Sequence, residues 1–343
     1  MNGTLVAELP RTPAMALTTD TAVDELGDKR TFGIEIADGK RAMRDATLNI
    51  HTYDLNFSDP VGGHLPGKPV SHPWSSAAVS AHTNTAIVTT FLRDVLKRNN
   101  IDNMGGSVVS TVNCVVPEFA TPPGSKIWPN AFWDGVQMLY GQVQPSSDGP
   151  LRSMAASLSV VAHELFHGIT GGTARLLYLG ETGALNESYS DIFGTIIANS
   201  AEPDIEKWSW KIGCGLCSTP EINRDMQDPT RCRQPKLMKD FKPVPLDQQN
   251  DYGGVHYFSG IHNYAAYSVM TANDGDNIVF KPKELAAMFY VALTQQLSRQ
   301  STFSDSRRGV VLATRSLFRK RPQQEIDLRV AAVEAGFDAA GIK

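Results

Sequence analysis

The string His163-Glu164-Leu165-Phe166-His167 is the feature that most constrains this chain of 343 residues. On a helix, residues four apart lie on one face about one turn apart, so both imidazoles can reach one metal ion while Glu164 lies beside it. Two neutral imidazoles and one carboxylate suit a tetrahedral Zn²⁺ and leave its fourth position open, as catalytic sites require. The fold must therefore bring a third, acidic ligand to this helix.

A second segment offers that ligand in Glu187. Its apolar positions follow helical spacing and are Leu185, Tyr189, Ile192, Phe193 and Ile196. On such a helix Glu187 and Asp191 lie one turn apart on one side. Metal-bound histidines need partners for their other ring nitrogen. We therefore expect Asp191 to hold His163 and Asn186 to hold His167. The plain alternative is two unrelated amphipathic helices with surface charges.

Length and composition indicate an ordinary soluble globular protein. A chain of 343 residues exceeds what one hydrophobic core usually supports, so two domains are expected. Charged residues make up 20% of the chain and hydrophobic residues 41%. The net charge of −4, without a long basic run, argues against nucleic acid as a partner. No apolar stretch is long enough to cross a membrane, so no membrane partner is expected.

The N-terminus and the cysteines leave alternatives open. Residues 1–29 lack a basic start followed by an apolar core, so either a leader has been removed or export uses another route. The four cysteines allow three disulfide pairings and are Cys114, Cys214, Cys217 and Cys232. Plain free thiols are one alternative to a disulfide, and a second metal site at the last three is another, although no histidine lies nearby to complete it.

The first half of the chain mixes strands and helices. Alternating polar and apolar residues predict strands between residues 31 and 58, and a Val- and Thr-rich run predicts another over 107–116. Residues 59–73, rich in Pro, Gly and His, are expected to form a loop. Helical spacing predicts helices over 77–99 and 153–170, the second being a central helix ended by Gly171-Gly172.

The second half reads mainly as helix. Helices are expected over 261–272, 282–296, 304–318 and 323–335, with an irregular region over 201–252. The expected fold class is therefore α+β with two domains. We place an N-terminal extension at 1–30, a mixed β/α domain including the central helix at 31–171, and an α-helical domain at 172–343.

These segments together resemble the thermolysin-like zinc neutral proteases. Nineteen residues between His167 and Glu187 give the family's spacing, and Gly183-Ala184-Leu185-Asn186-Glu187 is similar to its third-ligand segment. Residues 130–133 are similar to the substrate-binding edge strand, which residues 137–141 continue. Residues 251–256 are similar to the segment bearing the catalytic histidine. The resemblance runs from about residue 31 to the end, and it implies the family's two-domain fold.

The resemblance implies a secreted-type zinc metalloendopeptidase with one catalytic zinc. Its implied metal ligands are His163, His167 and Glu187. Zinc would lower the pKa of its water to about 7 and polarise the substrate carbonyl. The implied catalytic residues are Glu164 as general base, His256 and Tyr178 as donors to the oxyanion, and Asp251 as the partner of His256.

Substrate-binding residues are implied in the same way. Asn130 and the backbone of Ala131 would pair with an extended peptide as an added strand. Arg224 matches an arginine that binds the substrate carbonyl just after the cut, with a surface salt bridge as the plain alternative. The pocket for the residue after the scissile bond would be lined by Leu151, Met154, Val160 and Asn223. Its three apolar walls favour Leu, Ile, Phe or Val, and Asn223 adds a polar edge.

The chain departs from the family at its paired calcium site. The matching positions are Ser159, Ala198, Trp208 and Lys211, none of which supplies the anionic oxygen that Ca²⁺ prefers. Asp204 and Glu206 remain acidic but are too few to hold two ions. We therefore expect the double calcium site to be absent, while calcium elsewhere stays open.

Two other functions share part of this pattern. A zinc aminopeptidase shares the His-Glu-x-x-His string, but it needs a glycine-rich, acidic motif before His163 that the sequence lacks. A catalytically inactive peptide-binding relative is disfavoured because every residue that the chemistry requires is present. We expect a monomer that acts on peptides or proteins outside the cell, without nucleic acid or membrane partners.

Overall fold

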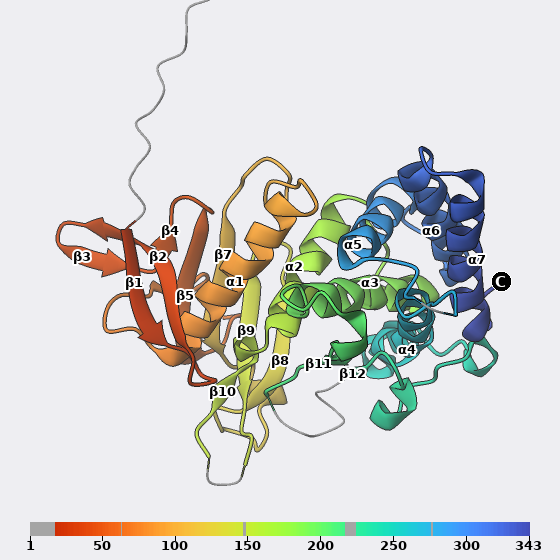
Figure 1. Ribbon diagram of the computed structural model, residues 1–343. Coiled ribbons are helices and arrows are strands. Elements are labelled where there is room, and N and C mark those ends of the chain that lie inside the picture. The colour runs from red at the N-terminus through yellow and green to blue at the C-terminus, as the bar shows by residue number, and fades with distance from the viewer. Residues whose placement is uncertain (1–17, 63, 147–148, 217–223, 276) are drawn as a thin grey trace, which may run out of the picture.

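The computed structural model describes residues 18–62, 64–146, 149–216, 224–275 and 277–343. Figure 1 shows strands and one long helix in one half of the molecule and a cluster of helices in the other. The central helix α2 (Leu158–Gly172) lies where the two halves meet. This α+β, two-part arrangement is the one expected from the sequence. The domain limits at residues 31 and 172 stay a prediction.

The N-terminal half holds two sheets. In the first, β1 (Thr18–Val23) pairs antiparallel with β2 (Lys29–Ala37), which also pairs with β3 (Lys40–Ala42). Regular structure thus begins before residue 31, inside the segment expected to be an extension. The second sheet comprises β4 (Arg44–Asp45), β5 (Ile50–Ser58), β6 (Lys68–Pro69), β7 (Val108–Cys114), β8 (Trp128–Trp133), β9 (Met138–Val143) and β10 (Arg152–Ser153).

The centre of the second sheet is parallel. Strands β5, β7 and β9 lie side by side in one direction, and α1 (Ser76–Asp94) crosses over between β5 and β7. The Ser75 side chain accepts a hydrogen bond from the Ala78 amide and so caps the start of this helix. The expected helix over 77–99 ends earlier, because Lys97 and Asn100 adopt left-handed backbone angles, with φ of 56° and 62°.

The strand expected to continue through residues 137–141 instead turns back. The Asp134 carboxylate accepts hydrogen bonds from the amides of Val136 and Gln137, and β9 then runs antiparallel to β8. Among the described residues, β8 pairs only with β9, so its other edge is free. The expected edge strand is therefore present, but residues 138–141 are its partner and not its continuation.

Helices α2 and α3 (Gly180–Ala198) pack closely against each other. The expected helix from Ser153 begins only at Leu158, because a short 3₁₀ helix (Met154–Ala156) and an extended Ser157 precede it. The rings of Phe166 and Phe193 stack at 3.9 Å between the two helices. A Cβ atom at Gly194 would lie 2.7 Å from the Ser159 carbonyl oxygen, so only glycine permits this approach.

The C-terminal half is helical, as expected. Its long helices are α4 (Asp251–Met270), α5 (Pro282–Val291), α6 (Phe303–Phe318) and α7 (Gln323–Ala339), and a π-helical turn (Ala292–Gln296) extends α5. The described part of the irregular region 201–252 contains short 3₁₀ helices and the strand pair β11 (Lys211–Ile212) and β12 (Arg224–Asp225). This pair brings Arg224 toward α3.

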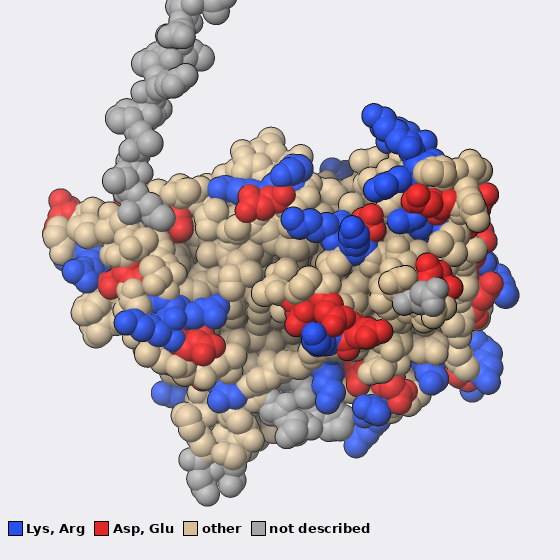
Figure 2. Space-filling view, viewed as in Figure 1, with Lys and Arg blue, Asp and Glu red and all other residues tan. Residues whose placement is uncertain are grey.

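The surface shows no segregation of charge on the face drawn in Figure 2. Lys and Arg side chains alternate with Asp and Glu across both halves of the molecule. Of the helices in the described ranges, none is both long and apolar enough to cross a membrane.

A buried histidine ties α1 to both sheets. The His82 side chain is completely buried; its Nε2–H donates to the Gly33 carbonyl at 3.0 Å, and its Nδ1 accepts from the Thr52 hydroxyl at 2.8 Å. Burial lowers the pKa of His82 to about 4, because the charged ring would lose its hydration. The native fold therefore holds a neutral imidazole here.

We predict that this histidine contributes to acid sensitivity. The unfolded chain binds a proton at His82 near pH 6.5 and the folded chain only near pH 4, so stability falls as the pH drops through this window. The contribution is on the order of 3 kcal/mol over the whole window. In His82→Gln, the free energy of unfolding, measured by urea titration at several pH values, should depend less steeply on pH. Parallel curves for the two proteins would contradict this account.

Candidate active site

Three side chains from α2 and α3 converge at the junction of the two halves. The Nε2 atoms of His163 and His167 lie 3.0 Å apart, and Glu187 approaches them at 3.4 and 3.3 Å through its two carboxylate oxygens. Within the described residues, this is the only group of three His, Cys, Asp or Glu side chains whose ligand atoms all lie within 4.8 Å of one another. The three side chains expected from their spacing in the sequence therefore converge on one point in the structure.

The group fits a cation. Glu187 is completely buried, and its Oε2 accepts no hydrogen bond from the described part of the chain, which is costly for a buried carboxylate. Burial and Arg224 lower the pKa of His163, but the carboxylates of Glu187 and Asp191 outweigh them and raise it to about 10. The local field thus favours positive charge. Two imidazole nitrogens and one carboxylate are the donors that zinc prefers.

The two histidine rings are oriented by hydrogen bonds at the nitrogen that faces away from the site. His163 Nδ1–H donates to Asp191 Oδ1 at 2.8 Å, and His167 Nδ1–H donates to Asn186 Oδ1 at 2.9 Å. These are the pairs named from the sequence. Because each ring donates through Nδ1, its Nε2 faces the site and can offer a lone pair to a metal ion once that nitrogen has lost its proton. The ring orientation required for metal binding is therefore set by the protein.

Arg224 reaches the same carboxylate from β12. Its Nε and Nη2 lie 2.9 and 2.7 Å from the Asp191 oxygens, and its Nη1 lies 4.0 Å from Glu187. Burial opposes ionisation of Asp191, but the guanidinium and His163 hold its pKa below the usual value. Arg224 is therefore part of the site, in an ion pair that is mostly buried and not on the surface.

Glu164 lies beside the ligands in a nearly dry environment. The residue is 5% exposed, and none of the hydrogen bonds among the described residues involves its carboxylate. Burial raises the pKa of Glu164, although the nearby His163 and His167 oppose that rise. A carboxylate with a raised pKa and free oxygens is suited to taking up a proton near neutral pH.

Tyr178 and His256 face Glu187 from the side of the helical half. The Tyr178 hydroxyl donates to Glu187 Oε1 and lies 3.1 Å from His256 Nε2. His256 Nδ1–H donates to Asp251 at 2.6 Å, and the same carboxylate accepts from the His256 amide at 2.8 Å. Partial burial opposes protonation of His256, but Glu187 and Asp251 raise its pKa. The half-exposed ring is therefore held as a donor.

The residues predicted to bind substrate lie on several different segments of the chain. On β8, Asn130 is exposed and its Oδ1 accepts a hydrogen bond from the Ala131 amide at 3.0 Å. Trp133, at the end of this strand, packs against Gly168 of α2. The predicted pocket positions are Leu151, which is half-buried, Met154 and Val160, which are buried, and Asn223, which lies outside the described residues.

Sequence reasoning missed one contact in the site. Asn263 Nδ2–H donates to Asp191 Oδ2 at 2.8 Å, from α4. The available signal was its position seven residues after His256, which places both residues on one side of a helix two turns apart. A buried amide among the apolar residues of that helix needs a polar partner.

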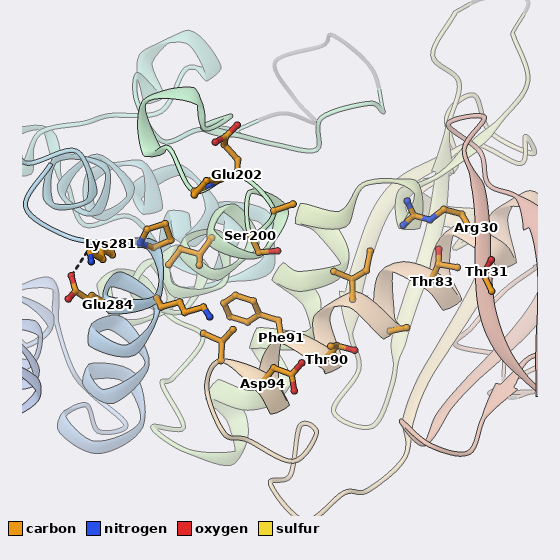
Figure 3. A pocket seen from close by; sticks show the side chains of 18 residues that line it. Arg30, Thr31, Thr83, Thr90, Phe91, Asp94, Ser200, Glu202, Lys281 and Glu284 are labelled. Atoms are coloured by element: carbon orange, nitrogen blue, oxygen red, sulfur yellow. Dashed lines mark hydrogen bonds between the residues drawn. The ribbon is translucent and has the colours of Figure 1, made fainter. Parts of the chain in front are cut away.

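A separate cavity of about 1000 Å³ lies away from these residues. It is lined by α1, by residues that follow α3 and by the start of α5, and Figure 3 shows Phe91 and Thr90 facing it from α1 with Glu202 and Lys281 on the other side. None of the metal-site residues lines it. The cavity is therefore not part of the candidate active site.

The positions matched to the calcium site are taken up by protein contacts. The Ser159 hydroxyl accepts a hydrogen bond from the Gly213 amide at 3.0 Å, and Trp208 is buried, with its indole N–H donating to the Glu202 carbonyl at 2.9 Å. Asp204 caps a 3₁₀ helix and pairs with Lys207. Hydrogen bonds and aromatic packing thus brace this region.

The fold and the site match those of a family of two-domain metallopeptidases. Two family models match consecutive parts of the chain: the thermolysin metallopeptidase catalytic domain over residues 19–171, and the thermolysin metallopeptidase alpha-helical domain over residues 174–342. The chain belongs to the thermolysin metallopeptidase family. The resemblance to this family, predicted from the sequence, is therefore confirmed.

Individual relatives agree with this assignment. The chain is 35% identical to bacillolysin from Bacillus amyloliquefaciens, over 95% of this chain and 58% of that protein. It is 34% identical to neutral protease NprE from Bacillus pumilus, over 91% of this chain and 95% of that one. Among solved structures, the precursor of protealysin, a metalloproteinase from Serratia proteamaculans, is similar with a TM-score of 0.66 and 26% identity, covering 86% and 87% of the two chains.

We predict that zinc stabilises the folded chain through Glu187. Zinc at about 100 times its Kd should raise the free energy of unfolding of the chelator-treated protein by about 2.7 kcal/mol. Glu187→Gln keeps the side-chain shape but removes the anionic ligand, so its stability should hardly respond to zinc. Glu181→Gln, on the same helix but outside the site, should respond like wild type. An equal response from Glu187→Gln would exclude this residue as a ligand.

We also predict that the paired calcium site is missing. Calcium titration of the zinc-loaded protein, followed by thermal unfolding, should change the melting temperature little, because the matching positions lack carboxylates. A rise of many degrees, or two calcium ions beside α3, would show that this prediction is wrong.

Proposed function

We propose that this chain is a zinc metalloendopeptidase that hydrolyses internal peptide bonds. The observation that carries the proposal is the buried Glu164 beside the converging His163, His167 and Glu187, with Tyr178 and His256 near the same carboxylate. Peptide hydrolysis needs a base, a proton shuttle and donors to the developing oxyanion. Each of these roles has a side chain within this one site.

The residues divide the chemistry among them. Bound zinc supplies a Lewis acid that polarises the carbonyl and lowers the pKa of water. Glu164 takes the proton from the attacking water and later transfers it to the leaving amine. Tyr178 and His256 donate hydrogen bonds to the carbonyl oxygen as its negative charge develops, and Asp251 keeps His256 oriented for this task.

The substrate would bind along β8. The free edge of this strand offers backbone groups to an extended peptide, beginning at Asn130 and Ala131. Arg224 would contact the carbonyl just after the cut. Its Nε and Nη2 are engaged with Asp191, so the contact would come from the Nη1 edge of the guanidinium.

Specificity would depend on the pocket for the residue after the scissile bond. Leu151, Met154 and Val160 supply apolar surface, which favours Leu, Ile, Phe or Val, and Asn223 would supply a polar edge.

We further propose that the protein acts outside the cell as a monomer, as the family resemblance implies. An aminopeptidase remains the competing function, and cleavage of peptides with blocked N-termini would separate the two.

We predict that Glu164→Ala retains zinc but loses peptidase activity. Removing a general base should lower kcat by about 10²- to 10⁴-fold, because the proton of the attacking water loses its acceptor. Activity is measured on a peptide blocked at both ends, and zinc content by metal analysis. Glu164→Gln, which keeps the shape, should be equally inactive. Near wild-type activity in either variant would contradict the proposed function.

Loss of an oxyanion donor should be less severe. Tyr178→Phe removes only the hydroxyl, so kcat should fall by about 10²- to 10³-fold while KM changes little, since the interaction strengthens in the transition state. A rise in KM alone would instead indicate that Tyr178 binds the ground state of the substrate.

We predict apolar residues after the cleavage site. In a peptide-library digest, an apolar side chain at this position should be preferred by about 10- to 200-fold, which corresponds to roughly 1–3 kcal/mol of burial. Met154→Ala should shift the preference toward larger side chains, because it enlarges the pocket. Frequent cleavage before charged residues would overturn this assignment.

A further inference from the structure

The carboxylate of Asp191 is fixed by donors from three elements. Its Oδ1 accepts from His163, its two oxygens accept from Arg224, and its Oδ2 accepts from Asn263. The bond from Asn263 is the end of a longer series. The members of this buried relay, in spatial order, are Tyr189, Ser306, His262, Ser188, Asn263 and Asp191.

The direction of every bond in the buried relay follows from its last member. Asp191 can only accept, so Asn263 must present its NH₂ group at 2.8 Å and turn its Oδ1 toward Ser188. The Ser188 hydroxyl then donates to that oxygen at 2.6 Å. Having used its single hydrogen, it accepts from His262 Nδ1–H at 2.7 Å. The amide orientation of Asn263 is therefore determined and not free to flip.

The remaining bonds continue in the same sense. A neutral His262 that carries its proton on Nδ1 accepts at Nε2, so the Ser306 hydroxyl donates to it at 2.8 Å. Tyr189 in turn donates to Ser306 at 2.9 Å. The apolar rings of Phe303 and Phe337 pack on His262, and burial lowers its pKa to about 3, in agreement with a neutral ring. Five bonds thus point toward Asp191.

The buried relay crosses three helices and is closed to solvent. Tyr189 and Ser188 lie on α3, His262 and Asn263 on α4, and Ser306 on α6. All six members are completely buried, so bulk water does not replace a lost bond. Removing one member leaves the neighbouring polar group without a hydrogen-bond partner. Because hydrogen bonds in a buried network strengthen one another, the remaining bonds are weakened as well.

We propose that Asn263 is a positioning residue for the metal ligand His163, acting through Asp191, and that Ser188 and His262 hold its amide in the required orientation. The inference rests on the proposed function, since it concerns the same site. With Asn263 in place, Asp191 keeps the rotamer that receives both His163 and Arg224. With the amide reversed, the Asn263 oxygen would face the Asp191 carboxylate, and the repulsion between these two acceptors would displace the carboxylate from His163.

The test compares zinc affinity, apoprotein stability and peptide cleavage in matched variants. Asn263→Asp keeps the shape but places a second acceptor against Asp191. Ser188→Ala removes the hydroxyl that holds the amide, and His262→Asn keeps a donor nitrogen near the position of Nδ1, whereas His262→Leu removes it. Thr314→Val is the control, because Thr314 is completely buried on α6 and, among the described residues, its hydroxyl bonds only to the Val310 carbonyl of its own helix. Zinc affinity is measured by competition with a chromophoric chelator.

We expect Asn263→Asp to weaken zinc binding by about 10- to 100-fold, the usual effect of losing a group that orients a ligand. Ser188→Ala and His262→Leu should weaken it less, His262→Asn should restore most of the affinity, and Thr314→Val should lower stability without changing affinity. Should Asn263→Asp not fold, the Ser188 and His262 variants decide the matter.

Two results would overturn the proposal. One is an unchanged zinc affinity in Asn263→Asp, or in both Ser188→Ala and His262→Leu. The other is a loss of affinity in Thr314→Val as well, in proportion to lost stability, which would assign the buried relay a merely structural role. A wild-type protein that binds zinc but cleaves no peptide would refute the proposed function alone, because the affinity comparison does not depend on turnover.

Discussion

The close packing of α2 on α3 is the constraint on which the rest of the site depends. Phe166 stacks on Phe193, and Gly194 lets the two backbones approach so closely that a Cβ atom at this position would collide with the opposite helix. This contact sets the register of the two helices, so that His163, His167 and Glu187 meet at one point. A larger residue at position 194 would separate the helices and move the ligands apart, even though it touches none of them.

The same packing buries three carboxylates. Asp191 is compensated by Arg224, His163 and Asn263, and therefore stays ionised. Glu187 is surrounded by His163, His167 and His256, which lower its pKa despite complete burial. Glu164 has no comparable partner among the described side chains, and its pKa rises. Environment thus gives three chemically similar groups different proton affinities, which suit the separate roles proposed for them: orienting a ligand, binding the metal and accepting a proton.

The sequence could predict what depends on local spacing and could not predict what depends on distant contacts. The i, i+4 spacing of His163 and His167, and of Glu187 and Asp191, already places each pair on one helix face, and the structure brings the pairs together. Asn263 is 72 residues from Asp191, so its contact depends on how α4 packs against α3. The predicted end of α1 lies too far along the chain because the helix is already closed by a left-handed turn at Lys97, a residue type with no strong preference for that region, whereas Asn100, which does favour it, lies beyond the true end.

His256 is positioned by a left-handed turn of the backbone and not by burial in a core. Asp251, Tyr252, Gly253 and Gly254 all have positive φ, so four successive residues form a left-handed turn before α4 continues. Two of them are not glycine, and such conformations cost roughly 1–3 kcal/mol each. His256 donates two hydrogen bonds to the Asp251 carboxylate, one from its amide and one from its ring, and these bonds offset part of that cost. An exposed histidine is thereby held at a fixed distance from Glu187 without being buried in a core.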